Sequence, residues 1–527
     1  MNGGPSASPR KLDVATAVVC ALAAVAVFLL FRELRHDDDF ITFRYARNLV
    51  EGNGLVFNPG QRILGTTSPL FALGSAALCA VVGADRLPEA AVALNALSLA
   101  AQAFLLYLLV RRRLPATALA LAALTLAGAT SPYTYLGLET HTYAALLLAA
   151  VWSTERGRPG LCGAFAGLAF LARHDAALLV PLVLLRYRHG DDQRDGLRFL
   201  AAAAAPVFPW LLFATAYYGW PLPRTLQAKA GLTPAWDYAA AYLERFFLVP
   251  GFSASPAVHA LAAVLAMLGL AIVARRLRSL LVLPAFGLTL FLVYAVIGPP
   301  STQSWHMYPA MLAVRMLMVV GALGGLESSL GAEASAAWRS WRRVLVATVA
   351  VLWLVPLTRY ALETSRKIGT DFWFGGRHAR YEHAAEWMLE HAGPGRSLLA
   401  IEVGTLGYLT DYEMIDAFGL VTATAGDAED AEHVVSLMYK HRPDLVLLHA
   451  PIQGRRFEEI TPYRTIHVFP WLNPWSTLLA REPSVLRRPE ELPDLRRQLE
   501  AFQARDGTSL GWPDVSDWRG EDGRSNR

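Results

Sequence analysis

Charge, cysteine and lysine are all scarce in this sequence of 527 residues. Only 17% of the residues are charged, against about 25% in a typical soluble domain, whereas 54% are hydrophobic. Because the hydrophobic residues gather in long runs, a soluble enzyme and a disordered chain are both excluded. The net charge of +4, with no basic stripe interleaved with aromatic residues, argues against nucleic-acid binding. The composition indicates a polytopic membrane protein with a more polar C-terminal part.

The three cysteines, Cys20, Cys79 and Cys162, all stand inside apolar runs. This placement favours small buried hydrophobic residues over a disulfide or a metal site. Lysine occurs only four times, so arginine carries most of the positive charge.

Eleven apolar segments are predicted to be transmembrane helices, since about 20 residues cross roughly 30 Å of hydrocarbon. These segments are 12–31, 88–110, 115–132, 140–154, 160–173, 175–187, 198–217, 257–274, 279–297, 308–325 and 344–360. The first is predicted to be a retained span rather than a signal peptide, because it ends in FRELRHDDDF without a small-residue cleavage site. The short segments 160–173 and 175–187 are expected to form a helical pair at a thinned region or an internal polar cavity.

The arginines of the short loops predict the orientation of the spans. If 67–83 crossed the membrane, the triple arginine at 111–113 would face outward. If 67–83 is an interfacial or re-entrant helix, every basic short loop falls on one side, including 186–198, 275–278 and 339–343. We therefore predict a multi-pass protein of the cell membrane with a cytoplasmic N-terminus and an extracytoplasmic C-terminal domain.

The composition changes after residue 360. RYEHAAEWMLEHAG and HVVSLMYKH are typical of helices, and SLLAIEV and DLVLLHA of buried strands, so the alternation predicts an α/β fold. We assign 1–360 to a transmembrane domain whose first outer loop is 32–66, 361–483 to an extracytoplasmic α/β domain, and 484–527 to a poorly ordered tail.

Three adjacent acids follow the first predicted span. Asp37, Asp38 and Asp39 lie at the expected membrane surface, where ionisable groups are costly and often mark function. Acids can simply end a span, but apolar residues continue around these three, so we expect them to be held against a surface. On the helix predicted to follow, Arg44 and Arg47 either face a phosphate together or snorkel to the interface.

More polar residues fall in the other predicted outer loops. Each has a structural alternative, such as capping a helix end, but they collect on the face opposite to the arginine-rich loops. A shared site is therefore the stronger interpretation. Its candidate members are Glu139, Arg173, Arg224, Gln227, Lys229 and His306.

The stretch DDDFITFRYARNLVEGNGLVFNPGQRILGTTSP resembles the first outer loop of bacterial GT-C glycosyltransferases. It is most similar to the group that contains the mycobacterial terminal β-(1→2) arabinofuranosyltransferase. SPYTYLGLETHTYAALLL, FLARHDAALLVP, PLPRTLQAKAGL and EVGTLGYLTDYEMIDAFGLV resemble further family segments in the same order, so the match is spread over most of residues 30–450. The chain departs from the family pattern at Asp39, Gln61, Arg224 and HMYPAM.

The resemblance implies a GT-C-like α-helical membrane glycosyltransferase. Such an enzyme moves a sugar, arabinofuranose in the nearest group, from a polyprenyl-phosphate donor to an extracytoplasmic glycan acceptor with inversion. The family's acidic pair maps onto Asp37 and Asp38, which makes Asp37 the first candidate for the general base and Asp38 the second. Because phosphate leaves as a stable anion, one base could suffice.

The remaining candidates then have predicted roles. Developing charge on the phosphate calls for cations, and these are Arg44, Arg173 and Lys229, with Arg224 behind them. The predicted sugar or acceptor contacts are Glu139, Gln227 and His306. The chemistry requires no metal or other cofactor, although the acids could hold a divalent cation.

Two alternatives remain open from the sequence. A transporter or flippase of a lipid-linked sugar would also have many spans, and it predicts midplane polar residues, broken helices and repeated halves. The same fold could instead act as a protein O-glycosyltransferase or an O-antigen ligase. In the outer domain no motif suggests separate catalysis, and Glu402, Tyr408 and Asp416 are expected to be structural.

Overall fold

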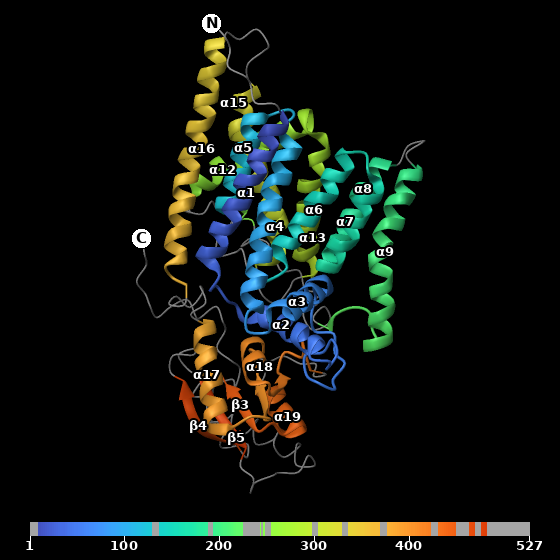
Figure 1. Ribbon diagram of the computed structural model, residues 1–527, viewed down its shortest axis with the longest axis vertical. Coiled ribbons are helices and arrows are strands. Elements are labelled where there is room, and N and C mark those ends of the chain that lie inside the picture. Colours follow the sequence, from blue (N-terminus) through green and yellow to red (C-terminus); the bar gives the residue numbers. More distant parts are fainter. Residues whose placement is uncertain are drawn as a thin grey trace.

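The computed structural model describes residues 9–128, 136–187, 193–224, 243, 246–247, 255–297, 304–328, 336–368, 377–422, 431–448, 463–469 and 476–481. These residues form an elongated molecule in which a bundle of apolar helices carries an α/β unit at one end (Figure 1). Gln227, Lys229 and the predicted tail 484–527 lie outside the described residues.

Seven helices in the described part of the chain are long and apolar enough to cross a membrane. They correspond to α1 (Pro9–Phe31), α4 (Leu87–Val110), α9 (Gln193–Tyr218), α12 (Pro256–Arg276), α13 (Val282–Ile297) with the turn before it, α14 (Tyr308–Val319) with its continuation into α15 (Gly325–Ser328), and α16 (Ala336–Ser365). Shorter helices complete the bundle: α5 (Pro115–Gly128), α6 (Thr140–Glu155), α7 (Pro159–Ala172) and α8 (Leu179–Leu184).

Each of the eleven predicted spans overlaps a helix. The segment 175–187 is a short α8 between two single 3₁₀ turns, and α16 continues to Ser365, so the predicted domain boundary at 360 falls inside a helix. The prediction of a mostly helical membrane protein is confirmed, whereas eleven crossings stay a prediction.

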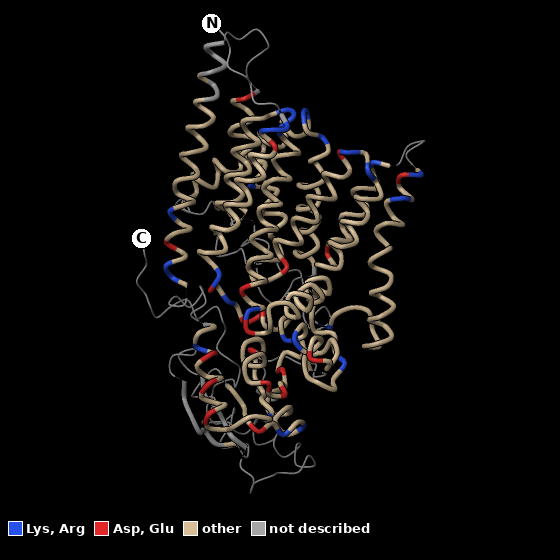
Figure 2. The backbone as a smooth tube through the Cα atoms, in the orientation of Figure 1, with Lys and Arg blue, Asp and Glu red and all other residues tan. Residues whose placement is uncertain are grey.

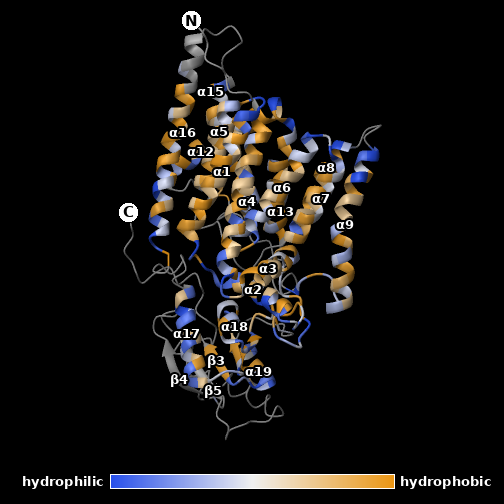
Figure 3. Ribbon diagram, viewed as in Figure 1, coloured by the Kyte–Doolittle hydropathy of each residue, from blue (hydrophilic) through white to orange (hydrophobic). Residues whose placement is uncertain are grey.

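Glycine lets neighbouring helices of the bundle approach closely. A Cβ atom at Gly163 of α7 would overlap the carbonyl of Phe199 in α9, and one at Gly269 of α12 would overlap the carbonyl of Leu317 in α14. Such close packing through small residues is typical of helices in lipid. Large apolar side chains of α1, α9, α12 and α16 are exposed. Figure 3 shows that the helices of the bundle are largely hydrophobic.

Basic residues of the connecting loops gather at the end of the bundle opposite to the α/β unit (Figure 2). The sequence predicted that these loops share one side. The cytoplasmic assignment of that side stays a prediction.

Helices α2 (Asp37–Val50) and α3 (Pro69–Val82) lie at the other end of the bundle, next to the α/β unit (Figure 1). With 14 residues, α3 is roughly 21 Å long, too short to cross the hydrocarbon of a typical bilayer. Its position agrees with the predicted interfacial or re-entrant helix.

The α/β unit contains a five-stranded sheet in the order β2-β1-β3-β5-β4. The strands are β1 (Ser397–Ala400), β2 (Glu413–Asp416), β3 (Leu445–Leu448), β4 (Tyr463–Phe469) and β5 (Ser476–Arg481). Strand β1 runs parallel to β2 and β3, whereas β5 is antiparallel to both β3 and β4. The helices of the unit are α17 (Arg377–Ala392), α18 (Gly404–Thr410) and α19 (Ala431–His441). Strands β1 and β3 and helices α17 and α19 coincide with the four predicted elements, and the others were not predicted.

Candidate functional site

The carboxylate of Asp37, at the start of α2, is held by the α/β unit. Its Oδ2 accepts a hydrogen bond from the backbone N–H of Gly404 at 3.0 Å, and its Oδ1 accepts one from Thr405 at 2.8 Å. Asp37 is 8% exposed. The first predicted acid is therefore buried at the junction of the bundle and the α/β unit and bonded to the first turn of α18.

The two acids that follow have different surroundings. Asp39 is 1% exposed, and its Oδ2 accepts a hydrogen bond from the backbone N–H of His36 at 3.1 Å, which caps α2. Asp38 keeps intermediate exposure. Of the three carboxylates, Asp38 is thus the most accessible, and Asp39 has a structural role that its place in the sequence did not reveal.

Arg44 and Arg47 of α2 face the α/β unit. The guanidinium of Arg44 donates to the carbonyl of Tyr412 at 2.7 Å, and that of Arg47 donates to the carbonyl of Tyr408 at 2.7 Å. Burial and the neighbouring Arg47 lower the pKa of Arg44 to about 9, so it remains charged at neutral pH. A Cβ atom at Gly407 would overlap this guanidinium. These contacts give Arg44 a docking role, and its phosphate-binding role stays a prediction.

The first outer loop continues this interface. The amide of Asn58 donates to the carbonyl of Met414 at 2.8 Å, and its Oδ1 accepts the N–H of Met414 at 3.0 Å. The side chain therefore pairs with β2 as a neighbouring strand would. Gln61 donates to Glu413 at 2.7 Å beside it.

The end of α9 and the segment after it also contact this loop. The hydroxyl of Tyr218 donates to the carbonyl of Leu55 at 2.6 Å, and the N–H of Arg224 donates to the carbonyl of Leu64 at 2.9 Å. The half-buried Arg224 therefore lies beside the first outer loop, and its membership of a shared site stays a prediction.

A buried charged cluster surrounds Arg173. Its guanidinium donates to Glu139 at 2.8 Å, to Asp175 at 3.1 Å and to the hydroxyl of Tyr294 at 3.3 Å. The ring of His306 stacks on Tyr294, with 5.4 Å between the ring centroids. The structure thus brings together Glu139, Arg173 and His306, three candidates from separate loops.

Sequence reasoning missed Tyr294 in this cluster. It stands near the end of an apolar span, where a tyrosine is also typical of a membrane interface. Only the charged residues across from it identify its role.

Several buried groups in and beside the cluster have no hydrogen-bond partner among the residues described. They include Oγ1 of Thr140 and Nε2 of His141, in the first turn of α6. The other side of the His141 ring meets Gln102 of α4 at 3.2 Å, and Gln102 accepts the hydroxyl of Tyr308 at 2.9 Å. Because an unpaired buried polar group costs about 1–3 kcal/mol, these atoms suit water or a hydroxylated ligand.

The acidic segment and the Arg173 cluster adjoin each other. The carboxylate of Asp39 packs against Gly137, leaving no room for a Cβ atom there, and Gly137 stands two residues before Glu139. Figure 2 shows acidic residues where the bundle meets the α/β unit. Among the described residues, no group of three or more His, Cys, Asp or Glu side chains is arranged to hold a metal ion.

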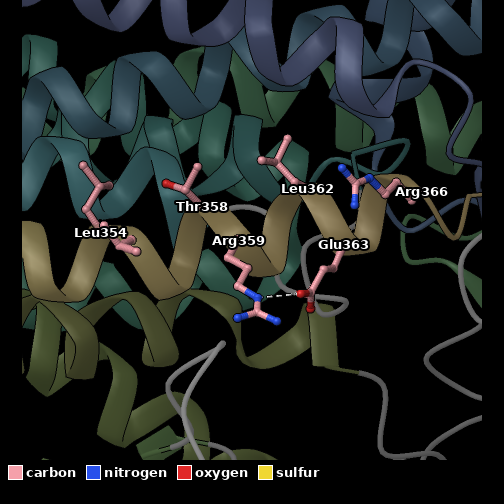
Figure 4. Close-up of a pocket in the computed structure, with 7 residues that line it drawn as sticks. Leu354, Thr358, Arg359, Leu362, Glu363 and Arg366 are labelled. Atoms are coloured by element: carbon pink, nitrogen blue, oxygen red, sulfur yellow. Dashed lines mark hydrogen bonds and ion pairs between the residues drawn. The ribbon is translucent and has the colours of Figure 1, made fainter.

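A separate groove lies along α16 (Figure 4). It is lined by Leu354, Val355, Thr358, Arg359, Leu362, Glu363 and Arg366. Arg359 donates to Glu363 at 2.7 Å within it. Because the groove shares no residue with the acidic segment or the Arg173 cluster, it is not part of the candidate site.

The sequence is similar to one described protein family and to one curated relative. The family described as "Domain of unknown function (DUF8728)" matches residues 370–490. A curated relative, the terminal β-(1→2)-arabinofuranosyltransferase of Mycobacterium tuberculosis, is 29% identical over 254 residues, which are 43% of this chain and 40% of the relative. The chain thus aligns with less than half of the length of that relative.

Two solved structures share the overall architecture. ArnT from Cupriavidus metallidurans superposes with a TM-score of 0.58 both when bound to undecaprenyl phosphate and in the apo state, at 13% and 14% identity. The superposition covers 89% of this chain and 98% and 99% of the ArnT chains. The chain therefore has the fold of ArnT, and the resemblance to GT-C membrane glycosyltransferases is confirmed.

Proposed function

We propose that this protein is a membrane glycosyltransferase that transfers a sugar from a polyprenyl-phosphate donor to an extracytoplasmic glycan acceptor. The observation that carries the proposal is the burial of Asp37 and Asp39, on either side of the more exposed Asp38, beside the Arg173 cluster where the bundle meets the α/β unit. The ArnT structure bound to undecaprenyl phosphate supports a lipid-linked donor, and the mycobacterial relative supports arabinofuranose as the sugar.

The reaction needs one base. The acceptor hydroxyl attacks the anomeric carbon of the donor, and a new C–O bond forms while the bond from that carbon to the phosphate oxygen breaks. The electron pair leaves with polyprenyl phosphate, and the hydroxyl proton passes to a carboxylate. Attack opposite the leaving group inverts the anomeric centre.

Asp38 is better placed than Asp37 to be that base. Asp37 is buried, and both of its carboxylate oxygens accept hydrogen bonds from backbone N–H groups. The next residue, Asp38, has intermediate exposure, so an acceptor can approach it more easily. We therefore reverse the order that the sequence suggested. Asp37 remains part of the site as the residue that positions Asp38.

The Arg173 cluster suits the donor sugar. Glu139 and Asp175 already neutralise Arg173, so a phosphate would compete with two carboxylates for it. The hydroxyl and imidazole groups around it offer hydrogen bonds that match sugar hydroxyls. We assign the phosphate to cations of the segment that begins at Arg224, including Lys229, with Gln227 as a sugar or acceptor contact.

The proposal includes an orientation in the cell membrane. The basic loops at one end of the bundle would be cytoplasmic, as would the N-terminus, and the candidate site with the α/β unit would be extracytoplasmic. A donor flipped to the outer leaflet would then reach the site from the membrane.

The test is donor turnover by the full chain in lipid nanodiscs. Purified protein is incubated with a panel of polyprenyl-phosphate sugars and an oligosaccharide acceptor, and released polyprenyl phosphate is measured. We expect turnover with one donor, a loss of at least about 100-fold in Asp38→Asn, and little change in Glu33→Gln, a nearby acid whose side chain is 71% exposed. Release from no donor, together with protein-dependent translocation of a lipid-linked sugar in vesicles, would support the transporter alternative instead.

A further inference from the structure

We infer that the α/β unit contributes to catalysis, because the first turn of α18 positions the acidic pair Asp37 and Asp38 at the start of α2. This inference rests on the proposed function and assigns a role to the region that matches a domain of unknown function. Gly404 and Thr405 of this region are positioning residues, since they affect the proposed general base, Asp38, only through Asp37.

The contact between α18 and Asp37 requires glycine at its centre. A Cβ atom at Gly404 would overlap the backbone carbonyl of Asp37 and would lie 2.9 Å from its Oδ2. The backbone of α18 therefore lies directly on the backbone and the side chain of Asp37. Since both carboxylate oxygens are bonded to adjacent N–H groups, Asp37 is fixed in position and in rotation.

Residues of α17 and α2 complete the contact. The hydroxyl of Thr405 is 3.0 Å from Nδ1 of His378, and the His378 ring stacks on Phe40 with 4.6 Å between centroids. Phe40 stands one turn after Asp37 on α2. Helices α2, α17 and α18 thus hold one another around the first acid.

A second contact fixes the other end of α18 to α2. Arg47 donates to the carbonyl of Tyr408, and its guanidinium lies 4.7 Å from the centre of the Tyr408 ring. The Tyr408 hydroxyl in turn donates to the carbonyl of Ala84 at 2.7 Å, in the turn between α3 and α4. With α18 attached at both ends, the start of α2 cannot rotate without displacing α18.

The consequence concerns the rate of transfer rather than donor affinity. Asp38 follows Asp37 directly on α2, so the direction of its carboxylate depends on how Asp37 is held. A displacement of about 1 Å at a catalytic group can lower the rate by about 100-fold. We therefore expect a fall in kcat with little change in KM for the donor when the α18 contact is broken.

The decisive variants are Thr405→Pro and Thr405→Ala in the full chain. Proline removes the N–H that Asp37 uses and is tolerated in the first turn of a helix, where that N–H makes no helical hydrogen bond. Alanine removes the Thr405 side chain beyond Cβ and keeps the N–H. We expect kcat of Thr405→Pro to be at least about 10-fold below that of Thr405→Ala, with the donor KM of the two variants within about twofold.

A second pair covers the case in which Thr405→Pro fails to fold. Gly404→Ala adds a methyl group against Asp37, whereas Gly74→Ala adds the same group on α3, where nothing lies within 4 Å. Only Gly404→Ala is expected to lower kcat by 10-fold or more. Equal kcat in both pairs, with Asp38→Asn inactive, would overturn the positioning role and leave the proposed function standing.

Hydrogen exchange tests the contact without any turnover. Asp37→Ala is expected to speed exchange of the Gly404 and Thr405 amides by at least about 10-fold relative to wild type, while the amides of β1 keep their protection. Unchanged exchange at both residues would overturn the inference even if transfer were found. If wild-type protein transfers no sugar but this change in exchange occurs, the contact stands and the proposed function fails.

Discussion

Burial makes the Arg173 cluster sensitive to substitution. Arg173→Gln removes the cation from two carboxylates that lie within 3.1 Å of it, on side chains that are only 5% and 11% exposed. Removing one partner of a buried ion pair typically costs about 3–5 kcal/mol, because the other charge stays buried without compensation. With Glu139 and Asp175 both affected, we expect a loss near the upper part of that range.

Unfolding of the purified protein in detergent measures this loss, and a double-mutant cycle assigns it. Adding Glu139→Gln to Arg173→Gln removes one uncompensated carboxylate, so the double variant is expected to be more stable than the sum of the single losses by at least about 1 kcal/mol. Arg359→Gln is the matched control, because Arg359 also bonds to an acid at 2.7 Å, but with a side chain that is 80% exposed. Equal destabilisation by Arg173→Gln and Arg359→Gln would refute the reasoning.

The junction with the α/β unit allows three further predictions. Burial raises the pKa of Asp416 from 3.8 to about 6, so the folded state holds its proton over a pH range in which the unfolded state loses it. The stability due to this group should fall by up to about 3 kcal/mol as pH rises from 4 through 6, and Asp416→Asn should remove that part of the slope in unfolding measured against pH. Gly65→Ala would bring a Cβ atom to 2.7 Å from a carbonyl of the α/β unit, and it should cost about 1–3 kcal/mol in thermal unfolding, whereas Gly74→Ala should cost under 1 kcal/mol. Asn58→Ala leaves the backbone groups of Met414 unpaired and should cost about 1–3 kcal/mol, seen as faster limited proteolysis of the α/β unit than in wild type. Unchanged proteolysis would show that the loop does not hold the unit.

The helices of the bundle could be predicted because the length of an apolar run is a local property. The span predicted at 88–110 is α4 at Leu87–Val110, and the break at 111–113 is a run of arginines. Strand β2 and helix α18 were missed because GTLGYLTDYEMID is short and has neither a clear helical period nor a long apolar run. Their structure depends on partners far away in the chain.

The predicted membrane topology was enough to group some of the candidate site residues. Placing the outer loops on one face brought Glu139, Arg173 and His306 into one group, and in the structure Arg173 bonds to Glu139 and to Tyr294, on which His306 stacks. The partner of each charge was not predictable. A sequence shows that Arg44 is a cation, but it does not show that its acceptor is a carbonyl 368 residues later.

The charges of α2 match the two ends of α18. Asp37 at the start of α2 meets the N-terminal amides of α18, and Arg47, ten residues later, meets the carbonyl of Tyr408 in its last turn. Acids at a helix N-terminus and bases at its C-terminus are the favourable arrangement for the helix dipole. The order of charge in DDDFITFRYARN therefore specifies how the α/β unit docks. Reversing either charge would oppose the dipole and leave buried backbone groups unpaired. Variants of Asp37 should therefore lose docking of the α/β unit and catalysis together. Variants of Arg47 should lose docking before they lose catalysis.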